Sequence, residues 1–446
     1  MKKLVFGFIF LLVFHLSRAQ TVPETIDELL KVYSKQFAFN GNVLVAQHDS
    51  IIFEKGYGFR DLASHQTNDR NTIFQVGSIT KQFTAAIILQ LRQKNLLRLD
   101  DALSKYIPGY PNGDQITIEQ LLTHTSGVYN YTADENFMRS RASVPIALDS
   151  LIGLFKNKPL DFKPGTKYNY SNSGYVLLGY IIEKLTGKTY FAVVREQILE
   201  PLHMKHSGFD FKGLKSSDKA TGYLKLTATR SQLASIVDST VSYAAGAMYS
   251  CLEDMYAWDR SLYTNAIIDS VSIRDAFTPH LANYGYGWVI DTVYGKKVVM
   301  HEGGTFGFVS FIGRIPDDKT CIILFDNHSG IGMVKIAEDI NAIMNNQPYD
   351  FPKYRKEIEL DEATLRQYEG VYQFGPHFLI SIKINDGHLT AQANGQGQND
   401  FYAEKKDYFF AKIVETQMQF IRDGDGKVTR LTIYQGGQEV QGKKIK

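Results

Sequence analysis

Strand-like runs near both ends of the first 345 residues constrain the fold of this chain most strongly. Two such runs, at 42–47 and 51–60, are separated by a polar turn at 48–50 and predict a β-hairpin. Four more runs follow a stretch from 96 to about 280 that is rich in helices and turns. This order predicts an α/β (α+β) fold, with one antiparallel sheet flanked by helices beside a helical subdomain. The four later runs are 286–290, 297–300, 308–314 and 321–325.

The chain is long enough for two domains. Its 446 residues exceed what one ordinary hydrophobic core holds. We place the first domain at 20–347, a polar, proline-bearing linker at 348–357, and the second domain at 358–446. The first domain also has helical spacing at its two ends, at 25–37 and 331–344. The second is predicted to be a small all-β barrel or sandwich, from short strand-like runs at 378–384, 389–393, 401–412, 418–422 and 428–435.

The first 19 residues have the pattern of a secretory signal peptide. Lys2 and Lys3 precede an apolar run from 4 to 16, and the small residues Ser17 and Ala19 follow it. We therefore expect an exported protein, periplasmic or secreted, with no stable membrane span after cleavage, because the apolar run is too short to cross a bilayer. Removing the three cations of this segment lowers the net charge from +2 to −1, so no nucleic-acid partner is expected.

The two cysteines are expected to be buried free thiols. Cys251 and Cys321 lie far apart in partly apolar stretches, and although export would permit a disulfide, free cysteine is readily buried as a small apolar side chain. Neither has a second cysteine or a histidine at metal-ligand spacing. His203 and His206 flank a turn without an acidic third ligand, so we interpret them as surface residues. No metal and no cofactor are expected.

An acidic segment near the end of the chain resembles the start of a calcium loop, Asp423-Gly424-Asp425-Gly426. Such a loop needs glycine and glutamate further on, and Val428 and Tyr434 stand at those positions. We therefore predict a hairpin turn here.

Ser78-Ile79-Thr80-Lys81 opens a long apolar run and is the strongest candidate for chemistry. Residues three apart are neighbours on a helix, so Lys81 can reach the Ser78 hydroxyl. A serine hydroxyl needs a base to take its proton, and a lysine can be that base if burial lowers its pKa toward neutrality. The alternative is that Ser78 only caps the helix. A second Ser-x-x-Lys at Ser216 and Lys219 lacks an apolar helix behind it.

Tyr170-Ser171-Asn172 offers a proton carrier and an amide. A nearby lysine ammonium would favour the Tyr170 phenolate, and the Asn172 amide can bond both Lys81 and a substrate carbonyl. Tyr-x-Asn also occurs at 110–112 and 263–265, but only the copy at 170 follows a Pro-Gly turn and precedes an apolar helix. An isolated Tyr-x-Asn is alternatively an ordinary turn.

His301-Glu302-Gly303-Gly304 lies between two strand-like runs. The glycines would let the backbone approach a substrate, and His301 would face Ser78 across a cleft. His-x-Gly also occurs at His206 and His328, without flanking strands on both sides. His301 is alternatively a structural histidine.

These motifs, in this order, resemble the β-lactamase-related serine hydrolases, the group of class C β-lactamases, penicillin-binding carboxypeptidases, D-aminopeptidases and family VIII esterases. The resemblance covers roughly 25–345, and the tail more loosely resembles a lipocalin-like β-module found in some members. Four stretches extend the resemblance: Leu121 to Gly127, Tyr170 to Tyr175, Ala245-Gly246 before Tyr249-Ser250, and Tyr284 to Trp288.

The resemblance implies an acyl-enzyme mechanism. Ser78 would attack a carbonyl, Lys81 and Tyr170 would relay its proton, and the backbone N–H groups of Ser78 and Gly304 would form the oxyanion hole. Asn172 would orient the acyl group, with His301, Gly303 and Gly304 lining the substrate site. Typical β-lactamases have lysine where His301 stands, and a histidine titrates near neutrality and is a less reliable cation for a β-lactam carboxylate.

The sequence thus predicts a monomeric serine hydrolase that acts on a small ester, amide or D-amino-acid peptide, including substrates derived from the cell wall. The alternatives are a true β-lactamase or D-Ala-D-Ala carboxypeptidase, and a catalytically silent binder of a ligand or of peptidoglycan. An α/β-hydrolase is disfavoured, because the chain contains no Gly-x-Ser-x-Gly.

Overall fold

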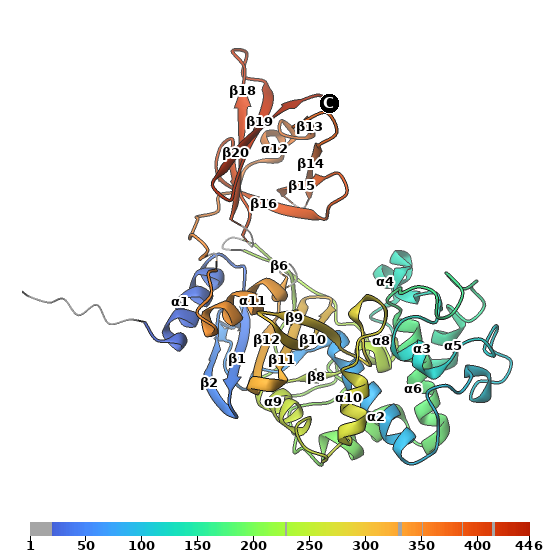
Figure 1. Cartoon of the computed structure of the whole chain (residues 1–446). Coiled ribbons are helices and arrows are strands. Elements are labelled where there is room, and N and C mark those ends of the chain that lie inside the picture. The colour runs from blue at the N-terminus through green and yellow to red at the C-terminus, as the bar shows by residue number, and fades with distance from the viewer. Residues whose placement is uncertain (1–19, 228–229, 329–331, 350, 386, 413–414) are drawn as a thin grey trace, which may run out of the picture.

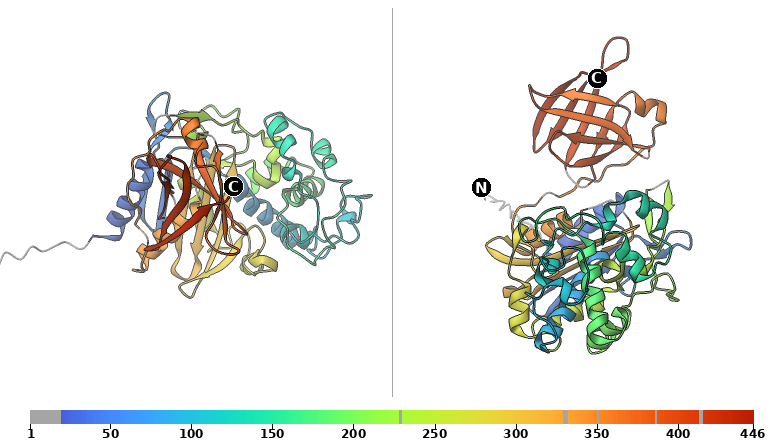
Figure 2. Two further views of the ribbon diagram at one scale, coloured as in Figure 1. Left: turned by 90° about the horizontal axis from the view of Figure 1, so that it is seen from above. Right: turned by 90° about the vertical axis from the view of Figure 1, so that its right-hand side faces the viewer.

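The computed structural model describes residues 20–446 except 228–229, 329–331, 350, 386 and 413–414. The chain forms an N-terminal domain of helices around a sheet and a separate C-terminal barrel (Figures 1 and 2). The signal peptide predicted at 1–19 lies outside the described residues. No helix in the described ranges is both long and apolar enough to cross a membrane.

A six-stranded antiparallel sheet organises the N-terminal domain, in the order β2-β1-β12-β11-β10-β9. The first and last segments of the domain pair at its centre, since Val43 of β1 lies opposite Leu324 of β12. The predicted closure of one sheet by both ends of the domain is confirmed. The strands are β1 (Gly41–Gln47), β2 (Ser50–Gly56), β9 (Val289–Val293), β10 (Lys296–Thr305), β11 (Phe308–Ile315) and β12 (Thr320–Asp326).

Successive residues of each strand point to opposite faces of the sheet, and helices cover both faces, so the sheet is buried on both sides. On β1, Val43 and Val45 pack toward one face, and Leu44 and Ala46 pack toward the other. The first face is covered by α1 (Val22–Lys35) and α11 (Met333–Met344), which lie side by side in Figure 1. Thr21 caps α1 in a capping box with Glu24, so the helix begins where the sequence supplies the cap.

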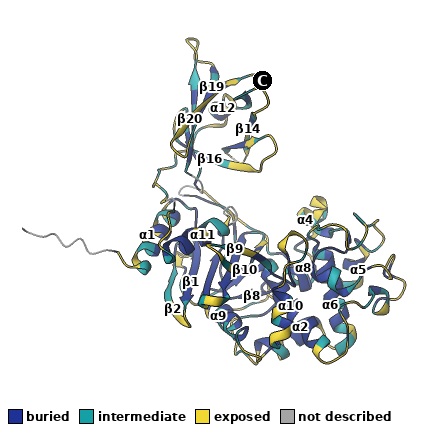
Figure 3. Cartoon of the chain, viewed as in Figure 1, coloured by how far each residue is buried: buried dark blue, intermediate teal, exposed yellow. Residues whose placement is uncertain are grey.

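The other face carries α2 (Thr80–Gln93), which starts immediately after the 3₁₀ turn η1 (Gly77–Ile79). Every residue of α2 from Thr80 to Leu91 is buried, since the sheet lies on one side and further helices surround the rest (Figure 3). The other helices of this region are α3 (Ile118–Leu122), α4 (Glu135–Arg141), α5 (Leu148–Gly153), α6 (Asn172–Thr186), α7 (Tyr190–Val194), α8 (Ser239–Gly246), α9 (Leu252–Ser261) and α10 (Ser270–Ala276).

Three small antiparallel pairs connect these elements. β5 pairs with β8 just before η1 and thereby fixes the chain that leads to Ser78. The six strands are β3 (Phe59–Asp61), β4 (Gln66–Thr67), β5 (Phe74–Gln75), β6 (Tyr223–Leu226), β7 (Ser231–Leu233) and β8 (Tyr249–Ser250).

The C-terminal domain is a closed eight-stranded barrel, which settles the predicted choice between barrel and sandwich. A short helix, α12 (Glu362–Arg366), precedes it, and Leu365 of this helix is buried in the barrel core. The strands are β13 (Gly370–Gln373), β14 (Leu379–Asn385), β15 (His388–Ala393), β16 (Gln398–Lys405), β17 (Tyr408–Phe410), β18 (Thr416–Arg422), β19 (Val428–Gln435) and β20 (Gln438–Lys444).

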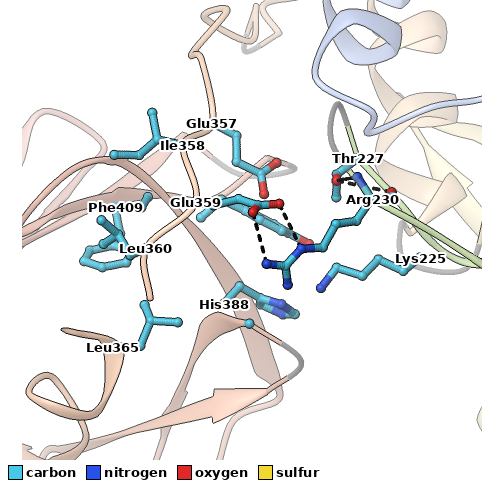
Figure 4. A pocket seen from close by; sticks show the side chains of 13 residues that line it. Lys225, Thr227, Arg230, Glu357, Ile358, Glu359, Leu360, Leu365, His388 and Phe409 are labelled. Carbon is cyan, nitrogen blue, oxygen red and sulfur yellow. Dashed lines mark hydrogen bonds and ion pairs between the residues drawn. The ribbon is translucent and has the colours of Figure 1, made fainter. Parts of the chain in front are cut away.

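The two domains meet at the β6–β7 hairpin. Arg230 in its turn forms an ion pair of 2.9 Å with Glu359, which lies on the segment leading to α12 (Figure 4). On the barrel side, Lys412 pairs with Glu357 at 2.8 Å and lies over the ring of Tyr402. An ion pair therefore joins the β6–β7 hairpin to the segment that leads to the barrel (Figure 4).

Several predicted boundaries were wrong. The run at 286–290 becomes a strand only from Val289, because Gly287 takes a left-handed φ of 80° and the chain turns there. The run at 401–412 is two strands, since Asp407 has φ 65° and makes a turn between β16 and β17. The sequence interpretation missed α12, β13 and β20. The turn at 423–426 does join two antiparallel strands, β18 and β19, as predicted.

Candidate active site

Ser78 is held against strand β10 by a very close approach of two backbone segments. A Cβ on Gly303 would lie 2.0 Å from the Val76 carbonyl oxygen, and a Cβ on Gly77 would lie 2.7 Å from the Gly304 nitrogen. Gly77 also has φ 50°, in the region that favours glycine. The Ser310 hydroxyl donates a hydrogen bond of 2.9 Å to the Val76 carbonyl. Glycine at 77 and 303 therefore lets η1 touch the sheet.

The Ser78 side chain does not cap the helix. No side-chain capping bond is found at the start of η1 or of α2, whose flanking residues are Val76 and Ile79. The Ser78 Oγ lies instead 3.0 Å from the Lys81 Nζ. In the second Ser-x-x-Lys copy, the Lys219 Nζ donates to the Lys212 carbonyl at 3.3 Å. Only the first copy joins its serine and lysine among the contacts described.

Lys81 is completely buried and has three oxygen neighbours. Besides Ser78, its Nζ donates to the Asn172 Oδ1 at 2.8 Å and to the Ala245 carbonyl at 2.7 Å. Neither partner carries a charge. Burial without a counter-ion holds the Lys81 pKa well below its ordinary value, because an ammonium group loses its hydration there.

The Ala245 carbonyl is available to Lys81 because it lies in the last turn of α8, where carbonyls have no partner within the helix. Tyr243 has φ 39° and ψ −134° inside this helix, outside helical geometry. In the same turn, the Ala244 carbonyl accepts a hydrogen bond of 2.7 Å from Thr84 of α2, and the Ala245 carbonyl accepts from Lys81. The Tyr243 hydroxyl is anchored at 2.7 Å to Glu183. A non-glycine residue in such a conformation persists only where its surroundings enforce it.

Asn172 begins α6, and both ends of its side-chain amide are engaged. The Oδ1 accepts from Lys81, and the Nδ2 donates to the Thr132 hydroxyl at 2.9 Å. Its backbone N–H donates to the Asn130 Oδ1 at 3.1 Å. Asn172 therefore holds Lys81 in place, and Thr132 fixes which end of the amide faces the amine.

Tyr170 places its ring centroid 4.8 Å from the Lys81 Nζ. Burial raises the pKa of the Tyr170 hydroxyl, and a hydrogen bond with Ser78 opposes this only in part. The expectation that a lysine ammonium would favour the phenolate was wrong, since burial dominates and the pKa of Lys81 is itself lowered. Tyr170 stands in the site as a protonated phenol.

His301 is buried on β10 and bonded through both ring nitrogens. Its Nδ1 lies 2.5 Å from the Glu302 carbonyl, to which it must donate, and its Nε2 therefore accepts from the Tyr284 hydroxyl at 2.8 Å. Burial, together with the nearby Lys81, lowers the pKa of His301 to about 3. The expectation of titration near neutrality was wrong, and the imidazole is neutral at physiological pH.

Sequence reasoning gave no role to His124 and Tyr284. The His124 ring packs 4.2 Å from Tyr170 and 4.6 Å from Tyr284, and its Nδ1 accepts from the Ser171 N–H at 3.1 Å. Burial and the nearby Lys81 lower the His124 pKa, so this ring is also neutral. Both residues lie within stretches that carried the family resemblance, and these stretches could have pointed to a role for His124 and Tyr284 in the site.

Ser78, Tyr170, Tyr284 and His301 line a cleft of about 450 Å³. A Cβ on Gly304 would meet no atom within 4 Å, so the space beside its backbone is open. Glu302 is the only carboxylate among the described lining residues, and no lysine or arginine is among them. The lining residues are Ser78, Tyr168, Tyr170, Tyr284, Val289, Met300, His301, Glu302, Gly303, Gly304, Val309 and Val334.

Cys251 and Cys321 are buried free thiols, as predicted. The interpretation of His206 as an isolated surface residue was incomplete, because its ring lies near Cys251 and Asp254, with possible ligand atoms within 4.8 Å of one another. The Asp254 carboxylate already accepts from the His206 N–H at 2.7 Å and from the Ser207 hydroxyl at 2.8 Å. These bonds give the group a structural role at the start of α9.

Comparison with known proteins gives matches over nearly the whole chain. Residues 26–341 match a family model described as Beta-lactamase, and residues 354–444 match one described as a domain of unknown function (DUF3471). The chain is 26% identical to penicillin-binding protein 4* of Bacillus subtilis (strain 168), over 96% of this chain and 100% of that protein. It is 28% identical to the teichoic acid D-alanine hydrolase of Staphylococcus aureus (strain MRSA252), over 71% of this chain and 78% of that one. Among solved structures, a D-stereospecific amidohydrolase from Streptomyces sp. is 25% identical with a TM-score of 0.64, covering 72% of this chain and 99% of that one.

Proposed function

Because the chain belongs to the beta-lactamase family of serine hydrolases, we propose that it forms an acyl-enzyme at Ser78 with a small ester, amide or D-amino-acid peptide. The proposal rests on the chemistry that the cleft residues can perform together. The assignment of Ser78, Lys81 and Tyr170 as catalytic residues is part of it.

The surroundings of the Lys81 amine carry this proposal. A neutral amine has two N–H groups and one lone pair. Two of its three neighbours, the Asn172 Oδ1 and the Ala245 carbonyl, can only accept hydrogen bonds, so they take both N–H groups. The lone pair is then left for the Ser78 hydroxyl 3.0 Å away. With its pKa lowered by burial, Lys81 is placed to take the serine proton as a general base.

The remaining steps use groups with suitable protonation states. As Ser78 attacks the carbonyl, the negative charge develops near the start of α2 and beside Gly304, where backbone N–H groups can stabilise an oxyanion. Tyr170 is protonated and hydrogen-bonded to Ser78, so it can deliver a proton to the leaving group and recover one through Lys81. Hydrolysis of the acyl-enzyme repeats these transfers with water as the nucleophile.

The charge of the cleft favours neutral esters, amides and D-alanyl compounds over β-lactams. A β-lactam carries a carboxylate, and His301 is neutral where a cation would be needed to bind it. The names of two relatives, a teichoic acid D-alanine hydrolase and a D-stereospecific amidohydrolase, agree with this choice. A true β-lactamase or D-Ala-D-Ala carboxypeptidase is the second candidate, supported by the full-length similarity to penicillin-binding protein 4*. A catalytically silent binder would not need a buried lysine bonded to a serine.

We also propose that the protein is exported and works as a monomer on substrates from the cell wall. The signal-like segment at 1–19 supports export, and the name of one relative, a teichoic acid D-alanine hydrolase, supports a substrate from the cell wall. The domain boundaries 20–347 and 358–446 belong to the same proposal.

Active-site labelling tests the proposal directly. A fluorophosphonate probe should add one adduct to the intact protein, and the labelled peptide should contain Ser78. Ser78→Ala should abolish labelling and turnover, while Ser216→Ala, the matched change in the second Ser-x-x-Lys copy, should keep both. Label that persists in Ser78→Ala would refute the assignment.

A second assay separates the substrate classes. Turnover of p-nitrophenyl acetate, a D-alanyl amide and a chromogenic cephalosporin should be measured side by side. We expect the first two to exceed the cephalosporin. Fastest turnover of the cephalosporin would favour the β-lactamase alternative.

A further inference from the structure

The interior of the C-terminal barrel is filled at one end only. At the filled end, aromatic rings pack against one another, with Tyr368 4.5 Å from Phe420 and 5.0 Å from Phe409. Leu365 of α12 is buried with them. The inward-facing residues of β18 pass from the filled end to the cavity: Phe420 and Met418 lie in the aromatic core, and Thr416 lines the cavity beyond it.

Beyond this aromatic floor, the other end of the barrel encloses a cavity of about 490 Å³. The cavity exists because small side chains line it: Ala391 and Ala393 of β15 face the cavity, where larger residues could have filled the barrel interior. Apolar side chains form most of the wall, among them Ile380, Phe401 and Ile433. The volume lies within the ordinary range of small-molecule sites, and eight-stranded barrels are wide enough to hold one small ligand.

Two observations specify what the cavity would accept. None of its described lining residues is charged, so an ion placed inside would lose its hydration without a counter-charge. The Thr416 side chain lines the cavity, and its hydroxyl is buried without a hydrogen-bond partner among the described residues. A buried polar group without a partner is uncommon, and a rotation of the Thr416 side chain would present its hydroxyl to a ligand hydroxyl or carbonyl in the cavity.

We propose that the barrel binds one uncharged molecule with an apolar body and a hydroxyl or carbonyl group, of the size of a medium-chain fatty alcohol. The apolar body contacts Ile380, Phe401 and Ile433, and the polar group bonds the Thr416 hydroxyl. Phe378, which is 42% exposed, lies at the mouth and covers the entering molecule. This site is separate from Ser78 and does not depend on the chemistry proposed there.

The test uses the full-length protein and the uncharged fluorescent probe N-phenyl-1-naphthylamine. Ala393→Trp should fill the cavity and reduce probe binding at least tenfold. Gln392→Trp is the matched control, because Gln392 is the exposed neighbour on the same strand, and it should bind the probe as the parent protein does. Circular dichroism and turnover at Ser78 should be unchanged in both variants, which shows that each is folded.

Competition then identifies the ligand chemistry. 1-Decanol should displace the probe at least tenfold more effectively than decanoate or decyltrimethylammonium. Thr416→Val, which keeps the shape and removes the hydroxyl, should weaken 1-decanol about fivefold and leave decane unchanged. Equal probe binding in the parent, Ala393→Trp and Gln392→Trp proteins would overturn the site. Equal displacement by charged and neutral compounds would overturn the ligand class.

Discussion

Asn172→Asp tests whether Lys81 acts as a neutral base. The substitution preserves the shape of the side chain and turns the atom 2.8 Å from the Lys81 Nζ into a carboxylate oxygen. The Thr132 hydroxyl, 2.9 Å from the other end of the amide, can rotate to donate to the new carboxylate. The fold should therefore tolerate the change, while the protonated form of Lys81 gains a counter-ion.

The size of the effect follows from the distance. Two unit charges 2.8 Å apart attract by about 6 kcal/mol at an effective dielectric constant of about 20. Even half of that attraction corresponds to a displacement of about two pH units, since one unit is about 1.4 kcal/mol. The protonated amine is the stabilised form, so activity should require a higher pH.

The measurement is the pH dependence of kcat/KM for p-nitrophenyl acetate, whose acid limb reports the base in the free enzyme. In Asn172→Asp the acid limb should move to higher pH by about two units or more, so activity at a pH below both limbs should be reduced about a hundredfold. Asn172→Leu removes the same acceptor without adding charge, so its rate should fall without this movement. An acid limb at the same pH in the parent and in Asn172→Asp would refute Lys81 as the base.

Three further outcomes follow from the site. The pKa of His301 is about 3 in the folded state and ordinary in the unfolded state, so the unfolded state binds more protons between pH 3 and 6.5, and stability falls as the pH drops through that window. His301→Gln should therefore flatten the slope of unfolding free energy against pH by about 1.4 kcal/mol per pH unit. An unchanged slope would contradict this. Tyr284→Phe leaves the buried His301 Nε2 without its donor and should lower the free energy of unfolding in urea by about 1–3 kcal/mol, whereas no loss would show that the bond is unimportant. Gly303→Ala should lower the free energy of unfolding by about 3 kcal/mol in the same assay, because its Cβ would lie 2.0 Å from the Val76 oxygen. Gly304→Ala, whose Cβ would meet no atom within 4 Å, should change it little. Equal effects of the two substitutions would contradict the close approach.

The fold could be predicted from the sequence because its signals are local. Strand periodicity and the turn at 48–50 indicated the hairpin β1–β2, and the four later runs correspond to β9, β10, β11 and β12. The resemblance to the β-lactamase family is confirmed by the match over 26–341. β20 was missed because its residues, at 438–444, are polar and mostly exposed, so only pairing with β19 and β13 defines it as a strand.

The protonation states in the site could not be predicted, because they depend on burial. The sequence identified Tyr170 and His301 as candidate residues. A nearby lysine ammonium suggested a phenolate at Tyr170, and the ordinary pKa of histidine suggested a partly charged imidazole at His301. In the fold, both lie in a cluster with His124 and Tyr284, where desolvation disfavours every charged form. The residue type indicates which group can move a proton, and the packing around it decides which form is present.

The Ala245 carbonyl shows a second limit of sequence reasoning. A base made from lysine needs acceptors for both of its N–H groups, and only one of them, Asn172, is a side chain that a motif can reveal. The other is a main-chain oxygen in the last turn of α8, beyond Tyr243, whose conformation is one that tyrosine rarely adopts. The residue type at position 245 could not indicate that its carbonyl accepts a hydrogen bond from Lys81, since every amino acid carries the same main-chain carbonyl. The part of the site that leaves the amine lone pair free for Ser78 is therefore encoded in the path of the backbone, which the Tyr243 to Glu183 hydrogen bond holds from outside the cleft.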